Sequence, residues 1–209
     1  MKRTDMKSLG LSQRFITESS LYTGFYLGRV ISQSKDLYKV MTEKSEVAAE
    51  ISGKLRFAAI SSADYPGVGD FVMLDREDDA GGNAIIHHIL TRKSAFIRKA
   101  AGTANAEQIV AANIDTVFIC MSLNNDYNLR RVERYLGIAW DSGAIPVIVL
   151  TKADLCDDVN EKLQELDSVA CGVEVFVTSS LTEDGLPAIK KYLGEGRTIA
   201  FIGSSGVGK

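Results

Sequence analysis

The chain has 209 residues, of which 45% are hydrophobic and 24% are charged, and its formal net charge is −3. This composition supplies a packed core and excludes a globally disordered protein, and no apolar run approaches the roughly 18 residues that a membrane-spanning helix needs. The basic N-terminus lacks the apolar segment of a secretory signal, and the three cysteines are scattered without CxxC spacing. We therefore expect a cytoplasmic protein with reduced thiols and no membrane contact.

Charge is divided unevenly along the chain. Residues 1–103 carry three more basic than acidic side chains, whereas residues 104–209 carry six more acidic than basic ones. The length lies between that of one domain and that of two. A mildly basic first half suggests that any nucleic-acid contact lies there, although ordinary surface variation would also explain the difference.

Short apolar runs separated by turn residues follow an N-terminal extension over residues 1–24. We expect strands at residues 25–31, 36–41, 48–51, 55–60, 71–74 and 84–90. The segment Tyr-Pro-Gly-Val-Gly-Asp at 65–70 has the turn chemistry that precedes a strand in many OB-folds. The sequence therefore predicts an all-β OB-fold barrel over residues 25–103. Such barrels often bind oligonucleotides, but the fold alone does not establish this.

From residue 107 onward, continuous apolar runs alternate with amphipathic segments. Strands are expected at 117–121, 146–150, 173–177 and 198–202, and helices at 128–140, 159–169 and 186–193. Strand–helix alternation with short loops predicts a parallel α/β sheet over residues 104–209. The ligand site of such a sheet lies beyond the carboxyl ends of its strands.

A phosphate-loop pattern, G-x-x-x-x-G-K, follows the last expected strand. It is formed by Gly203, Ser204, Ser205, Gly206, Val207, Gly208 and Lys209. Its backbone N–H groups would wrap nucleotide phosphates, and Lys209 would reach the β- and γ-oxygens. The pattern therefore predicts binding of GTP or GDP with Mg²⁺, if the base-reading residues are also present.

A base-reading motif, Thr151-Lys152-Ala153-Asp154, follows the strand expected at 146–150. The Asp154 carboxylate can accept from both N1–H and the exocyclic NH₂ of guanine, and Lys152 can lay its stem over the ring. Thr151 stands where Asn is usual and has less reach. Ser179 and Ser180 follow the next strand, where a backbone N–H would meet guanine O6. The tetrapeptide alone could equally begin a helix, with Asp154 near the N-cap, but the phosphate loop favours the guanine-nucleotide interpretation.

The order of the two motifs is reversed relative to an ordinary P-loop GTPase, in which the phosphate loop comes first. The order predicts a circularly permuted GTPase domain that is incomplete at the phosphate loop. The strands expected before residue 198 supply only one side of the sheet, so the strand at 198–202 is expected at its edge. Two other constellations are weaker. Ser204 and Ser205 lie in a string like G-x-S-x-G, but the second Gly falls one place early. His87 and His88 are adjacent on a strand and would face opposite sides, one packed and one solvated, so they do not form a metal pair.

The chain resembles the circularly permuted GTPases RsgA or YjeQ, which act on the small ribosomal subunit. The resemblance covers nearly the whole chain and rests on four segments besides the phosphate loop. They are ILTRKSAFIR at 89–98 closing the barrel, EQIVAANID at 107–115 entering the sheet, NLRRVERYL at 128–136 and VLTKADL at 149–155.

The resemblance implies an OB-fold that touches 16S ribosomal RNA, a central GTPase and a C-terminal zinc-binding domain. It also implies a late role in maturation of the 30S subunit, which stimulates GTP hydrolysis. The Ser or Thr after the phosphate loop, both switch regions and the zinc motif are missing, so Zn²⁺ is expected only in the missing domain. We assign no catalytic residue or metal ligand here, and we expect the 209 residues alone to bind GTP poorly and not to hydrolyse it. The alternative is a non-hydrolysing RNA-binding module with a remnant nucleotide domain.

Five basic residues near the barrel are the expected partners of RNA phosphates. They are Arg29, Arg92, Lys93, Arg98 and Lys99. Arg92 and Lys93 would face opposite sides of a strand, so not all five can contact RNA at once. We expect the protein to act as a monomer apart from its ribosomal partner.

Overall fold

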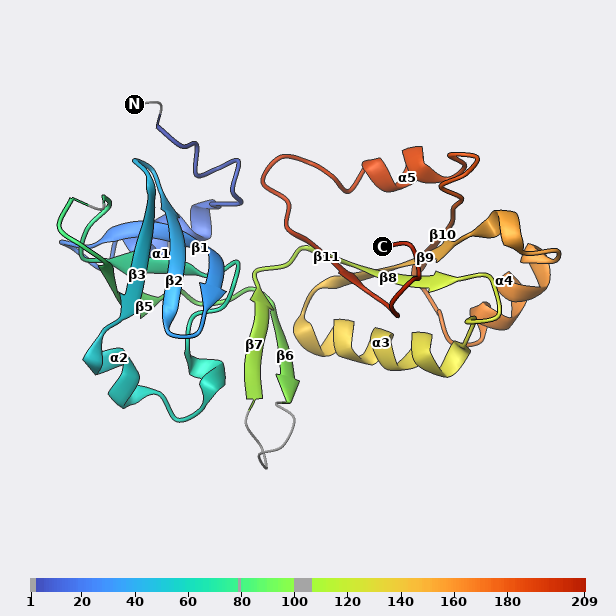
Figure 1. Cartoon of the computed structure of the whole chain (residues 1–209), viewed down its shortest axis with the longest axis horizontal. Coiled ribbons are helices and arrows are strands. Elements are labelled where there is room, and N and C mark those ends of the chain that lie inside the picture. The colour runs from blue at the N-terminus through green and yellow to red at the C-terminus, as the bar shows by residue number, and fades with distance from the viewer. Residues whose placement is uncertain (1–2, 79, 100–106) are drawn as a thin grey trace. The chain divides into compact units, whose positions relative to one another are not determined.

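The computed structural model describes residues 3–78, 80–99 and 107–209. The chain folds into two compact units, Met1–Asn113 and Ile114–Lys209 (Figure 1). Each unit has its own core and its own sheet, and each is described here by itself. Within the described residues, no helix has the length and apolarity to cross a membrane.

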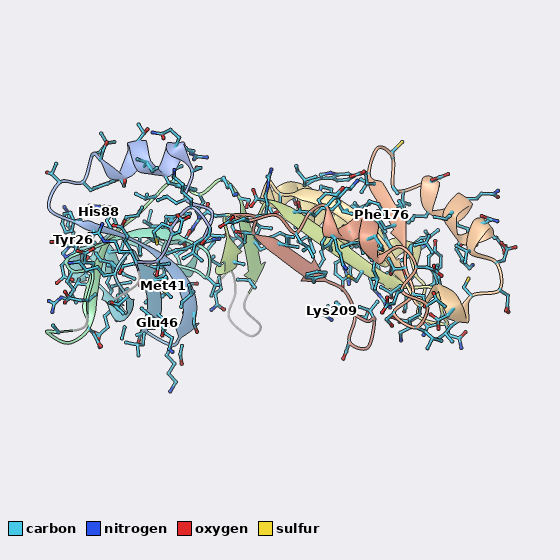
Figure 2. The ribbon with its side chains drawn as sticks, turned by 90° about the horizontal axis from the view of Figure 1, so that it is seen from above. Tyr26, Met41, Glu46, His88, Phe176 and Lys209 are labelled. Carbon is cyan, nitrogen blue, oxygen red and sulfur yellow. The ribbon has the colours of Figure 1, made fainter. Side chains whose placement is uncertain are left out.

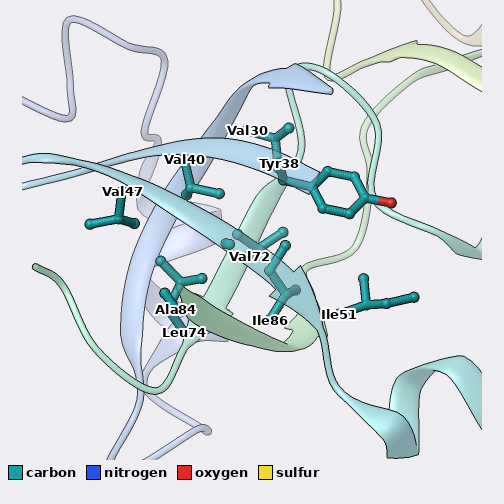
Figure 3. Close-up of a cluster of buried hydrophobic side chains, with 10 residues drawn as sticks. Val30, Tyr38, Val40, Val47, Ile51, Val72, Leu74, Ala84 and Ile86 are labelled. Atoms are coloured by element: carbon teal, nitrogen blue, oxygen red, sulfur yellow. The ribbon is translucent and has the colours of Figure 1, made fainter. Parts of the chain in front are cut away.

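The first unit contains a closed five-stranded barrel, as the sequence predicted. Its strands run in the order β1-β2-β3-β5-β4. They are β1 (Tyr26–Ser34), β2 (Leu37–Thr42), β3 (Glu46–Ile51), β4 (Phe71–Leu74) and β5 (Ala84–Ile89). All neighbours are antiparallel except β3 and β5, which are parallel. Alternate residues such as Val40, Val72 and Ile86 point inward and form the barrel core (Figure 3).

The segment between β3 and β4 differs from the prediction. Residues 55–60 were expected to form a strand, but a short helix, α2 (Gly53–Ala58), occupies most of this segment. Ser52 is its N-cap, and the hydroxyl accepts a hydrogen bond from the Leu55 N–H at 3.1 Å. The Ser-Gly pair therefore starts a helix through capping. A 3₁₀ turn, η1 (Ser62–Asp64), follows with a capping box of its own.

The N-terminal segment packs against the barrel. It contains the helix α1 (Gln13–Ser19). The Phe15 ring, only 2% exposed, lies 4.5 Å from the Phe71 ring of β4. Met6 and Leu90 belong to the same apolar cluster. This cluster forms a second core, on the outer side of the barrel wall, and it ties the segment to the first unit.

The segment 107–115 leads into the parallel sheet, as expected, but contributes no strand to it. Strand β7 (Glu107–Ala112) instead pairs antiparallel with β6 (Ala95–Lys99) in a two-stranded sheet. Gly67 and Gly69 allow this hairpin to lie against the barrel turn. A Cβ at Gly67 would lie 2.2 Å from Ile109, and one at Gly69 would lie 2.2 Å from the Ala112 carbonyl oxygen. The division between the units consequently falls after Asn113, later than residue 103.

The second unit is a four-stranded parallel sheet in the order β10-β9-β8-β11. The strands are β8 (Thr116–Ser122), β9 (Ile145–Thr151), β10 (Glu174–Val177) and β11 (Ile199–Ile202). The helices are α3 (Leu129–Ser142), α4 (Val159–Asp167) and α5 (Leu186–Lys190), and a 3₁₀ turn, η2 (Ala153–Leu155), follows β9. These strands and α-helices match the predicted ones within a few residues. Every residue of the central strand β8 is buried, which explains its continuous apolar run.

Strand β11 lies at the edge of this sheet and pairs only with β8 among the described strands. Its Phe201 is 48% exposed. The sequence predicted this edge position. The phosphate-loop residues begin directly after β11, so the edge strand determines where that loop lies.

Candidate nucleotide site

The predicted nucleotide-binding residues gather at the carboxyl ends of the parallel strands. Thr151 ends β9, residues 178–180 follow β10, and residues 203–209 follow β11. All strands of this sheet run the same way, so their carboxyl ends share one edge. Motifs that lie far apart in the chain are therefore neighbours in space.

The Asp154 side chain is exposed in the turn η2 and is oriented by Ser179. The Ser179 hydroxyl donates to Asp154 Oδ1 at 2.6 Å, and Ser179 is only 2% exposed. The same hydroxyl oxygen accepts from the backbone N–H groups of Leu181 and Thr182. The carboxylate is thus held at the sheet edge in the position of an acceptor that faces solvent.

Backbone hydrogen bonds connect the base-reading motif to the segment after β10. The Ala153 N–H donates to the Thr178 carbonyl oxygen at 3.1 Å, and Lys152 adopts a left-handed conformation with φ of 59°. The Ser179 N–H donates to the Asp184 carbonyl oxygen. The Ser179 N–H is therefore engaged within the fold. Of the two serines predicted to offer a backbone N–H to guanine O6, the exposed Ser180 is then the candidate donor.

Thr151 links the base-reading motif to the phosphate loop. Its hydroxyl donates to the Val207 carbonyl oxygen at 2.5 Å, and Thr151 is 8% exposed. The shorter side chain was expected to reach less far than Asn, yet it reaches the loop. Gly208, the next residue of the loop, has φ of 92°, a backbone conformation that favours glycine.

The phosphate loop depends on glycine and on one buried anchor. Gly203 has φ of 155°, and a Cβ there would lie 2.5 Å from the Cys120 carbonyl oxygen. Val207 is 1% exposed and packs into the apolar cluster of Phe118 and Val149. Lys209 Nζ donates to the carbonyl oxygens of Gly203 and Ser204 at 3.1 and 2.8 Å (Figure 2). The lysine therefore already lies across the loop.

Sequence reasoning missed one residue at this site. Arg131, which the sequence analysis did not assign to the site, donates from Nη1 to Asp126 Oδ2 at 2.8 Å and to the Ser204 hydroxyl oxygen at 2.6 Å. The only sequence signal was its position in the first turn of α3, directly after the β8–α3 connection. That position faces the strand ends instead of solvent.

Known proteins are similar to this chain in sequence and in fold. A model of the RsgA GTPase family matches residues 89–209. The chain is 48% identical over 200 residues to a protein of Lactiplantibacillus plantarum called small ribosomal subunit biogenesis GTPase RsgA 2, with 96% of this chain and 56% of that protein covered. It is 41% identical over 204 residues to RsgA 1 of Listeria monocytogenes, with 98% and 56% covered.

The chain belongs to the RsgA GTPase family. It spans about 56% of the length of these relatives. Among solved structures, YjeQ from Thermotoga maritima aligns with a TM-score of 0.68 at 26% identity, over 88% of this chain and 62% of that one. YloQ, described as a circularly permuted GTPase, aligns with a TM-score of 0.65 at 23% identity, over 90% and 62%, and supports the fold.

Two of the basic residues expected to contact RNA are engaged inside this RsgA-family barrel. Arg92 forms an ion pair with the fully buried Asp70. Its Nε and Nη2 atoms donate hydrogen bonds to the carboxylate at 2.9 and 2.7 Å. Its guanidinium also donates to the carbonyl oxygens of Ala63 and Tyr65. Arg29 lies over the Phe71 ring and donates to backbone carbonyls. This geometry argues that both arginines stabilise the barrel.

The other basic candidates lie at the β6–β7 hairpin. Lys93 is exposed just before β6. Arg98 and Lys99 lie on β6 in register with Gln108 and Glu107, and their side chains fall outside the described part of the structure. These three residues remain predicted RNA contacts.

The adjacent histidines are both half-buried, so the expected split into one packed and one solvated side chain is wrong. The His87 ring lies 4.7 Å from the Phe25 ring, and the His88 ring lies 4.4 Å from the Tyr22 ring, both in a tilted arrangement. Burial, with a smaller effect from His87, lowers the pKa of His88. Among the residues that the structure describes, no three His, Cys, Asp or Glu side chains gather as a metal site.

Proposed function

We propose that this protein binds GTP and GDP at the sheet edge and takes part in small-ribosomal-subunit biogenesis as a GTPase. One observation carries the proposal: the Thr151 hydroxyl joins the base-reading motif to the Val207 carbonyl of the phosphate loop. A phosphate loop and a guanine-reading carboxylate that belong to one rigid edge can bind the two ends of one nucleotide. The names of the relatives support the ribosomal role.

In the proposed complex, Asp154 accepts from the N1–H and NH₂ groups of guanine, while residues 203–208 donate backbone N–H groups to the phosphates. Lys209 exchanges its carbonyl partners for phosphate oxygens. Mg²⁺ accompanies the nucleotide and neutralises phosphate charge. The described residues hold no cluster of metal-ligating side chains, so we assign no ligand to that ion.

The first unit supplies the contact with 16S ribosomal RNA in the 30S subunit, with Lys93, Arg98 and Lys99 as its candidate phosphate partners.

Asp154→Asn tests the base assignment. Asparagine can still accept from Ser179, so the side chain keeps its orientation, but it presents an N–H to one of the two guanine donors. We expect GDP binding to weaken by about 100-fold, which corresponds to the loss of one charge-assisted hydrogen bond. Binding of xanthosine diphosphate should improve. The measurement is competition against a fluorescent GDP analogue.

Asp157→Asn is the matched control, because it removes an exposed carboxylate nearby. It should leave both affinities unchanged. Unaltered GDP preference in Asp154→Asn would refute the base assignment. These tests use the full-length protein, and a full-length protein that binds no guanine nucleotide but pulls down 30S subunits would favour the RNA-binding module instead.

A further inference from the structure

The Asn124 side chain helps to order the connection between β8 and α3, residues 123–128. Asn124 Oδ1 accepts from the Ser122 hydroxyl at 2.9 Å and from the Asp126 N–H at 3.1 Å. The Tyr127 N–H donates to the Asn124 carbonyl oxygen. These hydrogen bonds place Asp126 before the helix begins.

Arg131 lies in the first turn of α3, where a cation opposes the helix dipole. The N-cap Asn128 accepts from the Arg131 backbone N–H at 3.0 Å, which fixes where the side chain starts. Asp126 offsets the unfavourable charge by pairing with the guanidinium at 2.8 Å. The Arg131 side chain is only 24% exposed. Its placement therefore serves a contact other than helix stability.

That contact is the phosphate loop. Arg131 Nη1 donates to the Ser204 hydroxyl oxygen at 2.6 Å, while Lys209 Nζ donates to the Ser204 carbonyl oxygen at 2.8 Å. At the other end of the loop, Thr151 holds Val207. The loop is thus held near both ends, by Arg131 in the first turn of α3 and by Thr151 at the end of β9.

We propose that Arg131, held by Asp126, is a positioning residue that keeps the phosphate loop in its anion-binding form through Ser204. This inference rests on the proposed nucleotide binding. Glycine-rich backbone has many conformations, and a loop that must be ordered on binding reduces affinity by the cost of that ordering. An anchor made before the ligand arrives removes part of that cost.

Arg131→Ala tests the anchor, with Arg130→Ala as the matched control. Arg130 is the adjacent, exposed arginine, so both variants remove one positive charge from the same helix turn. We expect Arg131→Ala to raise the Kd for GDP about tenfold, with the ratio of GDP to ADP affinity unchanged. Arg130→Ala should stay within about twofold of the parent protein. Amide hydrogen exchange should accelerate at residues 203–208 in ligand-free Arg131→Ala, and not in β9.

Ser204→Ala completes a double-mutant cycle. If Arg131 acts through Ser204, the double variant binds GDP no more weakly than Arg131→Ala alone. Additive losses, equal effects of the two arginine variants, or an unchanged loop exchange rate would overturn the proposal. A fall in the GDP to ADP ratio would also overturn it, because a general structural defect disturbs the base contacts too. If the parent protein binds no GDP, the proposed function fails. The hydrogen-exchange measurement on the ligand-free proteins still tests whether Arg131 orders the phosphate loop.

Discussion

At the residue scale, the pair of Asp70 and Arg92 shows that a basic residue expected to contact RNA also holds a turn of the barrel together. Asp70 is fully buried, and its carboxylate accepts from Arg92 and from the Gly67 N–H at 2.8 Å. A buried carboxylate needs such partners, because desolvation otherwise makes its charge costly. Arg92 therefore closes the turn at 65–70 from inside the fold.

Arg92→Ala should destabilise the barrel. The variant leaves Asp70 buried without its charged partner, and we expect the free energy of unfolding of the first unit to fall by about 3 kcal/mol. Urea unfolding followed by circular dichroism measures this loss. Fluorescence of Trp140, the single tryptophan, reports on the second unit and should not change. Lys93→Ala is the neighbouring control. A loss below about 0.5 kcal/mol in Arg92→Ala would show that the pair is dispensable.

At the element scale, side-chain contacts outside the strands decide how the segments attach. The N-terminal segment is held by Phe15 against Phe71 and by aromatic stacking on β5, where Tyr22 meets His88. Helix α2 depends on the cap at Ser52, and β7 depends on the two glycines of the barrel turn. Local sequence patterns give little information about such contacts. Most of them join residues that are distant in the chain, and the cap at Ser52 starts a helix where the sequence suggested a strand.

The stacking of His88 predicts a pH dependence. Its pKa is lowered in the folded state, first by burial and then by the neighbouring charges of His87 and Lys54. The unfolded chain therefore takes up the proton first, and stability falls as the pH drops below about 6.5, whereas above that value it is unaffected by this group.

Urea midpoints of the parent protein and of His88→Phe between pH 8 and pH 5 measure this effect. Phenylalanine keeps a ring against Tyr22 and carries no titratable group, so the variant should lose less stability on acidification. Identical pH profiles for the two proteins would contradict the assignment. Titration of carboxylates elsewhere affects both proteins equally and cancels in the comparison.

At the scale of the whole molecule, each of the two units has a separate core and a separate predicted ligand. The nucleotide residues lie in the unit Ile114–Lys209, and the candidate RNA residues lie in the unit Met1–Asn113. Substitutions in one unit are therefore expected to leave the ligand of the other unit bound with its usual affinity, when each is measured alone.

Substitution of Lys93 tests whether the first unit contacts RNA. If Lys93 contacts a phosphate, Lys93→Ala should reduce the salt slope of log K for 30S binding by about one unit. Lys39→Ala removes an exposed lysine paired with Glu46 at 3.0 Å and serves as the charge-matched control. Equal slopes for the parent protein and Lys93→Ala would remove Lys93 from the RNA-binding surface. Nucleotide affinity should be the same in all three proteins.

The sequence by itself determined the class of each unit and the nucleotide motifs. Short apolar runs between turn residues specify the barrel strands, continuous apolar runs specify the buried parallel strands, and G-x-x-x-x-G-K with Thr-Lys-Ala-Asp specifies the two ends of one site. These signals are local, since each depends on residues that are neighbours in the chain. They also predicted the edge position of β11, because the strands before it supply only one side of the sheet.

Only the tertiary structure decided which charged side chains face a ligand and which face the fold. Arg92 and Asp70 are 22 residues apart, and Arg131 and Ser204 are 73 apart. The spacing of residues along the chain does not reveal such pairs. A basic residue in an amphipathic segment has the same sequence pattern whether its side chain is solvated or paired with a distant residue. The tie from Thr151 to Val207 spans 56 residues. It exists because parallel strands bring their carboxyl ends to one edge, where even a short hydroxyl side chain reaches the phosphate loop.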